Sequence, residues 1–280
     1  MTPERSIESG APGDQGGTIK QCCAQLYESD LVSRLIGDSF HPGGLELTGR
    51  LGEILQLTPE SHVLDAASGV GTSALFLAER FGCRVVGVDF SHRNVECANA
   101  EAARRRLADR VRFERADAEG LPFADGSFDA VMCECAFCTF PDKAAAARQF
   151  ARVLRNGGRL GLSDITRAGG SDGDLNDLMA WIACLADARP ADVYAALFVE
   201  AGFTVTHVET HDKALVELVQ KIRTRLFAAE MLAGLNQIGL PRVDFATARR
   251  MVRSALATIE QGRLGYAIVT AIRLVPLESP

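Results

Sequence analysis

The sequence predicts a single α/β domain built on a mostly parallel β-sheet with additional helices. Three observations predict this fold class. From His62 onward, short apolar runs rich in Val, Leu and Ile alternate with amphipathic stretches, as in βαβ units. A glycine-rich turn joins the first apolar run to the first amphipathic stretch. The composition, with 47% hydrophobic and 24% charged residues among 280, is that of a globular chain.

The chain before His62 reads differently from the rest. Residues 1–18 are polar and glycine-rich, without the apolar core of a signal peptide, and we expect a mobile tail there. Residues 19–58 form a predicted helical N-terminal segment, because apolar residues recur at helical spacing on both sides of the turn His41-Pro42-Gly43-Gly44. The main domain then covers residues 59–280.

The alternation gives the strands and helices of the main domain in order. Periodicity and turn residues predict strands at 62–66, 84–88, 111–115, 128–133, 159–163, 203–209 and 266–274. The helices between the first five strands are predicted at 72–81, 92–107 and 143–154. A helix at 191–201 ends at Gly202, and two helical patterns, 213–236 and 245–261, separate the last two strands.

Charge and cysteine content limit the class of protein. Lys and Arg number 30 against 36 Asp and Glu, for a net charge of −6, which disfavours general nucleic-acid binding. No apolar run approaches the roughly 18–20 residues of a membrane span. We therefore expect a soluble, cytoplasmic protein, in which the eight cysteines do not form disulfides. Cys83 and Cys97 sit among apolar residues and are expected to be buried.

Acidic residues follow three successive predicted strands. Asp65 lies in the turn Val63–Gly71, Asp89 ends the second strand, and Asp117 follows the third. Parallel strands end at one edge of a sheet, so these carboxylates are expected to line one crevice. There Asp89 can accept hydrogen bonds from both hydroxyls of a ribose, and Asp117 from an adenine amino group.

These residues belong to a wider set of motifs over residues 60–165. The set is Asp65-x-x-x-Gly69-x-Gly71, Asp89, Asp117, Leu121-Pro122-Phe123, Ser127-Phe128-Asp129 and Arg152-Val153-Leu154-x-x-Gly157-Gly158. In these motifs the chain resembles the class I S-adenosylmethionine-dependent methyltransferases. The resemblance implies a Rossmann-like, seven-stranded, mostly parallel sheet with helices on both faces. It also implies a helical insertion at about 212–262, before an antiparallel last strand.

The resemblance further implies S-adenosyl-L-methionine as cofactor and assigns its site. It places Asp65 near the methionine end, the loop of Ala67, Gly69 and Gly71 around the cofactor, and Asp89 at the ribose. Asp117 and the backbone of Ala118 would meet the adenine, and Phe90 would pack on the cofactor or in the core. The turn at 41–44 would close over the methionine carboxylate.

The glycine-rich loop departs from two patterns. Ala67 stands where the family usually has its first loop glycine, and alanine is tolerated there if φ stays negative. A nicotinamide dehydrogenase is disfavoured, since Gly71 is followed by Thr72-Ser73-Ala74 and not by the third glycine of G-x-G-x-x-G.

Six cysteines lie near the expected mouth of this site. They are Cys22, Cys23, Cys133, Cys135, Cys138 and Cys184. Their spacing is a poor zinc pattern, and no metal site is predicted. The run from Cys135 through Pro141-Asp142-Lys143, with Cys184 further on, resembles arsenite methyltransferases. That resemblance implies that Cys135 and Cys184 hold trivalent arsenic as the methyl acceptor, and Cys22 or Cys23 loosely resembles a cysteine of that family's N-terminal segment. Cys133 and Cys138 are further candidate substrate ligands because they lie beside Cys135.

The leading hypothesis is therefore an enzyme that methylates trivalent arsenic or a related thiophilic metalloid held by thiolates. The first alternative is a small-molecule O-, N- or C-methyltransferase similar to those of quinone biosynthesis, for which His211 or Asp164 could be the base. The second is a non-catalytic protein that binds cofactor or metalloid. The expected partners are a small-molecule or metalloid substrate and a second copy in a homodimer, with no nucleic acid or membrane. The missing cysteine in Thr72–Leu77 and the C-terminal helices depart from the arsenite family.

Overall fold

The computed structural model describes residues 41–168, 187–234 and 244–274. These residues form a seven-stranded sheet in the order β3-β2-β1-β4-β5-β7-β6. The strands are β1 (His62–Ala66), β2 (Arg84–Asp89), β3 (Val111–Arg115), β4 (Phe128–Glu134), β5 (Leu154–Arg167), β6 (Phe203–Thr210) and β7 (Leu264–Arg273). Strands β1 to β5 pair in parallel, and β7 runs antiparallel to both β5 and β6. The predicted fold class is confirmed.

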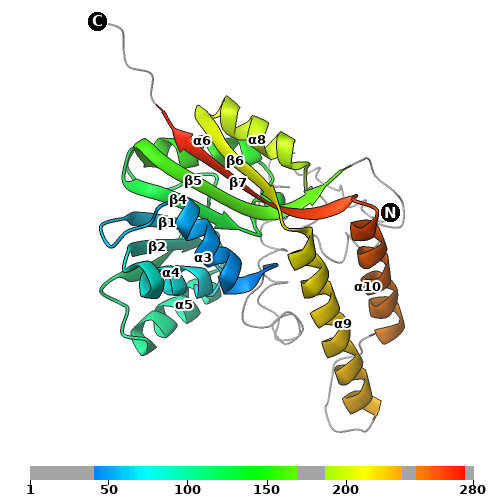
Figure 1. Ribbon diagram of the computed structural model, residues 1–280. Coiled ribbons are helices and arrows are strands. Elements are labelled where there is room, and N and C mark those ends of the chain that lie inside the picture. The colour runs from blue at the N-terminus through cyan, green and yellow to red at the C-terminus, as the bar shows by residue number, and fades with distance from the viewer. Residues whose placement is uncertain (1–40, 169–186, 235–243, 275–280) are drawn as a thin grey trace, which may run out of the picture.

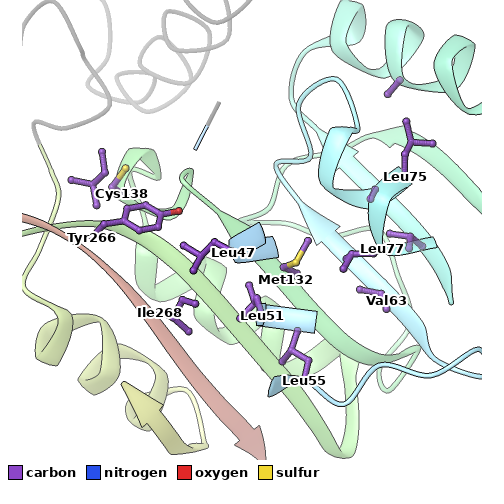
Figure 2. Close-up of a cluster of buried hydrophobic side chains, with 14 of the residues drawn as sticks. Leu47, Leu51, Leu55, Val63, Leu75, Leu77, Met132, Cys138, Tyr266 and Ile268 are labelled. Carbon is purple, nitrogen blue, oxygen red and sulfur yellow. The ribbon is translucent and has the colours of Figure 1, made fainter. Parts of the chain in front are cut away.

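Helices cover both faces of the sheet (Figure 1). On one face lie α3 (Gly44–Ile54), α4 (Thr72–Phe81) and α5 (His92–Arg104), and on the other α6 (Lys143–Val153) and α8 (Ala191–Glu200). Successive strand residues alternate between the two cores, as the twofold period of a strand requires: Val63 of β1 packs on the α3 side and Leu64 on the α6 side. Figure 2 shows the first core, where leucines of α3 gather with Met132 and Ile268.

The helical insertion lies between β6 and β7, as predicted. It consists of α9 (Asp212–Gly234) and α10 (Phe245–Glu260), which extend away from the end of the sheet (Figure 1). Leu215 and Val219 of α9 pack in the same buried cluster as Val252 and Ile259 of α10. No helix in the described ranges is long and apolar enough to cross a membrane.

Element boundaries differ from the prediction mainly at β5. This strand begins at Leu154 and continues to Arg167, beyond the predicted 159–163. The extra residues at its carboxyl end are mostly polar, and they pair residue by residue with β7 from Asp164 opposite Ala267 to Arg167 opposite Leu264. Antiparallel pairing with a distant strand therefore extends β5 beyond its local apolar run.

Candidate active site

A cavity opens at the carboxyl ends of β1, β2, β3 and β4. Among the residues with a predicted cofactor role, those that line it are Asp65, Ala67, Gly69, Asp89, Phe90, Asp117 and Ala118. The doubly wound topology brings them together because all four strands are parallel and end at the same edge. The crevice expected from the spacing of the acidic residues is thus present in the fold.

Asp89 organises the glycine-rich loop as well as facing the cavity. Its Oδ2 accepts a hydrogen bond of 2.8 Å from the backbone N–H of Gly69. Its Oδ1 accepts from the backbone N–H of Ser91 at 2.9 Å and from the Asn94 amide at 3.2 Å. Ser91 in turn caps α5 through Asn94 N–H. The end of β2 therefore fixes both the loop and the start of the next helix.

Gly71 does not have the surroundings expected of a cofactor contact. It is absent from the cavity lining, and a Cβ added to it would lie 2.4 Å from Cζ of Phe113. A Cβ on Gly87 of β2 would lie 2.3 Å from the same ring. Both glycines therefore make room for Phe113 in the core. Gly69 is the open position, since a Cβ there would meet no atom within 4 Å.

Ala67 does not meet the condition of a negative φ. Ala67 has φ 58°, in the left-handed region that disfavours residues with a Cβ. The turn from β1 into α4 needs this conformation, and Gly69 and Gly71 also have positive φ, at 55° and 84°. Alanine thus keeps the loop shape that glycine gives elsewhere, at a cost in backbone strain.

Ala67→Gly is expected to raise the free energy of unfolding by about 0.5–1 kcal/mol. Relief of left-handed strain, about 1–2 kcal/mol, exceeds the added chain entropy of glycine in the unfolded state, roughly 0.5–1 kcal/mol. Chemical denaturation measures the change. Arg106→Gly is the matched control, because Arg106 has φ 59° on an exposed turn far from the loop. A loss of stability for Ala67→Gly beside a gain for the control would contradict the assigned backbone conformation.

A polar cluster at the end of β4 was missed by the sequence analysis. The Glu134 side chain, 4% exposed, lines the cavity and accepts hydrogen bonds from Thr48, Ser73 and Ser163 at 3.0, 2.6 and 3.2 Å. His41 lies beside it, with Nε2 3.5 Å from Oε2. The one available signal was a charged residue ending an otherwise apolar strand. We call these five residues the Glu134 cluster.

The cysteines are distributed differently from the prediction. Cys135 lines the cavity, whereas Cys133 and Cys138 are 0% and 1% exposed in the core and do not line it. Burial, with the charge of Asp164 nearby, raises the pKa of the Cys133 and Cys135 thiols well above the usual range, which favours neutral thiols. Two of the three predicted thiol ligands in the described residues, Cys133 and Cys138, are thus core residues. Cys22, Cys23 and Cys184 lie outside the described residues.

Cys83 and Cys97, both expected to be buried, differ in their exposure to solvent. Cys83 is buried as expected, and burial raises its pKa to about 11. Cys97 is exposed, contrary to the expectation. Helix α5 turns Val95, Ala98 and Ala102 inward, and position 97 falls outside that face.

Asp164 and His211, the two residues suggested as a possible base, do not line the cavity. Asp164 is fully buried, burial raises its pKa to about 6, and it accepts hydrogen bonds from the backbone N–H groups of Cys138 and Ile165. His211 contacts Glu209 at 2.7 Å. All five histidines of the chain lie in the described residues, and His41 is the one that lines the cavity.

The chain matches a known family in this part of the fold. Residues 64–162 match the model of a methyltransferase domain. A 27-O-demethylrifamycin SV methyltransferase from Amycolatopsis mediterranei is 31% identical over 258 residues, covering 87% of this chain and 93% of the relative. A demethylmenaquinone methyltransferase from Deinococcus radiodurans is 34% identical over 162 residues, covering 57% of this chain and 65% of the relative.

Solved structures share the fold at lower identity. Phosphoethanolamine N-methyltransferase 2 of Haemonchus contortus, in complex with S-adenosyl-L-methionine, superposes with a TM-score of 0.78 at 18% identity. The match covers 92% of this chain and 60% of that one. At this identity the likeness supports the architecture alone.

Proposed function

This chain belongs to the class I S-adenosylmethionine-dependent methyltransferases, and from that premise we propose that it methylates an organic small molecule at an oxygen, nitrogen or acidic carbon. The relatives support an organic acceptor, since their names specify 27-O-demethylrifamycin SV and demethylmenaquinone. The observation that carries the proposal is that Cys135 is the one cysteine among the described residues that lines the cavity. Among those residues, a metalloid that needs two or three thiolates would find a single thiol at the cavity.

The lining of the cavity suits S-adenosylmethionine. Position 69 is open, so a ligand can approach the backbone of the loop. The charged lining residues Asp65, Asp89, Asp117 and Glu134 are all acidic, which suits a cationic donor.

We assign the cofactor contacts along the row of strand ends. Asp89 would hold the ribose, Asp117 and the Ala118 backbone the adenine, and Phe90 would pack against the cofactor. Ala67 and Gly69 would let the loop backbone approach it, and Asp65 would lie toward the methionine. When bound, the cofactor supplies an electrophilic methyl group on a positively charged sulfonium.

The histidines restrict how the acceptor is deprotonated. His41 Nδ1 lies 3.2 Å from the carbonyl oxygen of Pro42, and Nε2 lies within 3.5 Å of the hydroxyls of Thr48 and Ser73 and of Glu134. Both ring nitrogens are therefore engaged by the protein. An acceptor that is itself acidic, such as a phenol, an enol or a stabilised carbanion precursor, needs no histidine base, so we favour that class. Cys135, Ala136 and Phe140 would form the wall that orients it.

Competing acceptors test the proposal. We expect the purified enzyme to methylate a phenolic or naphthoquinol acceptor from labelled S-adenosylmethionine, and to give no methylated arsenic from arsenite with glutathione. Cys135→Ser is expected to change kcat/KM for the organic acceptor by less than about tenfold, because a serine loses one apolar contact in the pocket wall. Methylation of arsenite that disappears in Cys135→Ser would refute the organic acceptor in favour of the metalloid.

A further inference from the structure

Glu134 lies at one end of a row of acidic residues that follows the order of the strands. Going across the sheet from β3 through β2 and β1 to β4, the acids are Asp117, Asp89, Asp65 and Glu134. Neighbouring strands lie about 4.8 Å apart, so the two ends of the row are roughly 14 Å apart. The first three acids are each assigned above to a part of the cofactor: Asp117 to the adenine, Asp89 to the ribose and Asp65 to the methionine end. Glu134 has no such assignment.

The hydrogen bonds of Glu134 leave one acceptor position open. A carboxylate has about four lone-pair positions, two on each oxygen. Oε2 accepts from Thr48 and Ser73, which fills that oxygen. Oε1 accepts from Ser163, whose own hydroxyl accepts from Tyr266. Ser163 is the one side chain among the described residues that donates to Oε1, so a second position on this oxygen can take a donor in the cavity.

Asp65 and Glu134 are the two acidic residues at this end of the cavity. Burial, with the charges of Glu134 and Asp89 nearby, raises the pKa of Asp65 well above its usual range. Glu134 instead accepts hydrogen bonds from three hydroxyl groups. None of the described lining residues is Lys or Arg, and His41 Nε2, at 3.5 Å, stands farther from Glu134 than the three hydroxyls.

We propose that Glu134 binds the ammonium group of the donor's methionine moiety. Thr48 of α3, Ser73 of α4 and Ser163 of β5 act as positioning residues that hold its carboxylate toward the cavity. The inference rests on the proposed cofactor assignment, because it continues the same row of contacts past Asp65. It adds an ionic contact that distinguishes ligands with an amino-acid group from those without one.

Two ligands separate this contact from the rest of the site. S-adenosylhomocysteine carries the ammonium, and 5′-methylthioadenosine shares the adenosine and thioether but has no amino acid. By isothermal titration, Glu134→Gln is expected to weaken binding of S-adenosylhomocysteine roughly 10- to 100-fold, as loss of a charged hydrogen bond predicts. Binding of 5′-methylthioadenosine should change by less than about twofold, because this ligand has no ammonium group and so loses no hydrogen bond when Glu134 is replaced.

Thermal unfolding shows whether Glu134→Gln is folded. If it is not, a second variant tests the same contact. Ser73→Ala removes the 2.6 Å hydrogen bond and is expected to weaken S-adenosylhomocysteine about threefold to tenfold, again without affecting 5′-methylthioadenosine. An equal loss for both ligands, or no loss for either, overturns the role of Glu134. If the wild-type protein binds neither ligand, the proposed donor site itself fails, which is a separate result.

Discussion

Asp89→Ala is expected to weaken binding of S-adenosylhomocysteine by about 100- to 1,000-fold. The carboxylate would lose a charge-assisted hydrogen bond to the ribose, which contributes roughly 1.5–3 kcal/mol, or about 10- to 160-fold in affinity. The variant also frees the backbone N–H of Gly69 and the side chain of Asn94, which Asp89 now holds. Loop order and ligand contact are thus lost together. Equilibrium dialysis measures the affinity.

Two further variants separate these effects. Asp89→Asn keeps an oxygen that can accept from Gly69 or Ser91 but removes the charge, and we expect it to bind better than the alanine variant. Asp125→Ala is the matched control, since Asp125 is an exposed acid paired with Arg152 and does not line the cavity. Affinity in Asp89→Ala equal to that of the control would remove Asp89 from the ligand site.

The strand ends were the most predictable part of the site. Asp65 and Asp89 each end a short apolar run and Asp117 follows a strand of alternating apolar and charged residues, so local sequence was sufficient to place them at one edge of the sheet. Parallel order then follows from helices between the strands. The long helices before β7 were predictable for the same reason, because amphipathic periodicity is a local property.

The Glu134 cluster depends on contacts that local sequence does not contain. Thr48 and Ser73 lie 86 and 61 residues from Glu134 in the chain, and each comes from a different helix. Ser163 belongs to β5, next to β4 in the sheet. Their convergence depends on how α3 and α4 pack on the sheet. A packing property of this kind also decides that Cys133 and Cys138 point into the core, although the sequence places them beside Cys135.

The glycine loop shows the same limit at single residues. The pattern indicated a close approach of ligand at Gly69 and Gly71 alike. Only the tertiary structure reveals that Phe113, from β3, occupies the space beside Gly71. Likewise, the positive φ of Ala67 is set by the path from β1 into α4, and the alanine itself gives no sign of it.

Gly71→Ala is expected to lower the free energy of unfolding by about 2–5 kcal/mol. The left-handed backbone, with φ 84°, costs a residue with a Cβ about 1–2 kcal/mol. Overlap of that Cβ with the Phe113 ring adds about 1–3 kcal/mol, because the ring is 5% exposed in a packed core. Gly69→Ala is the matched control: φ is 55° and no atom lies within 4 Å of the new Cβ, so only the backbone cost of about 1–2 kcal/mol applies.

Urea denaturation of both variants, with Phe113→Leu as the second mutation of a double-mutant cycle, separates the two costs. We expect Gly71→Ala to destabilise the Phe113→Leu variant less than it destabilises the wild type. The smaller leucine side chain relieves the overlap with the new Cβ but not the backbone strain. Equal destabilisation of the two glycine variants would mean that Phe113 moves aside at no cost, and Gly71 would then be explained by φ alone. Ligand binding should follow the opposite order, weakened more by Gly69→Ala because position 69, and not 71, faces the cavity. Stability and binding would thus depend on different glycines of one loop.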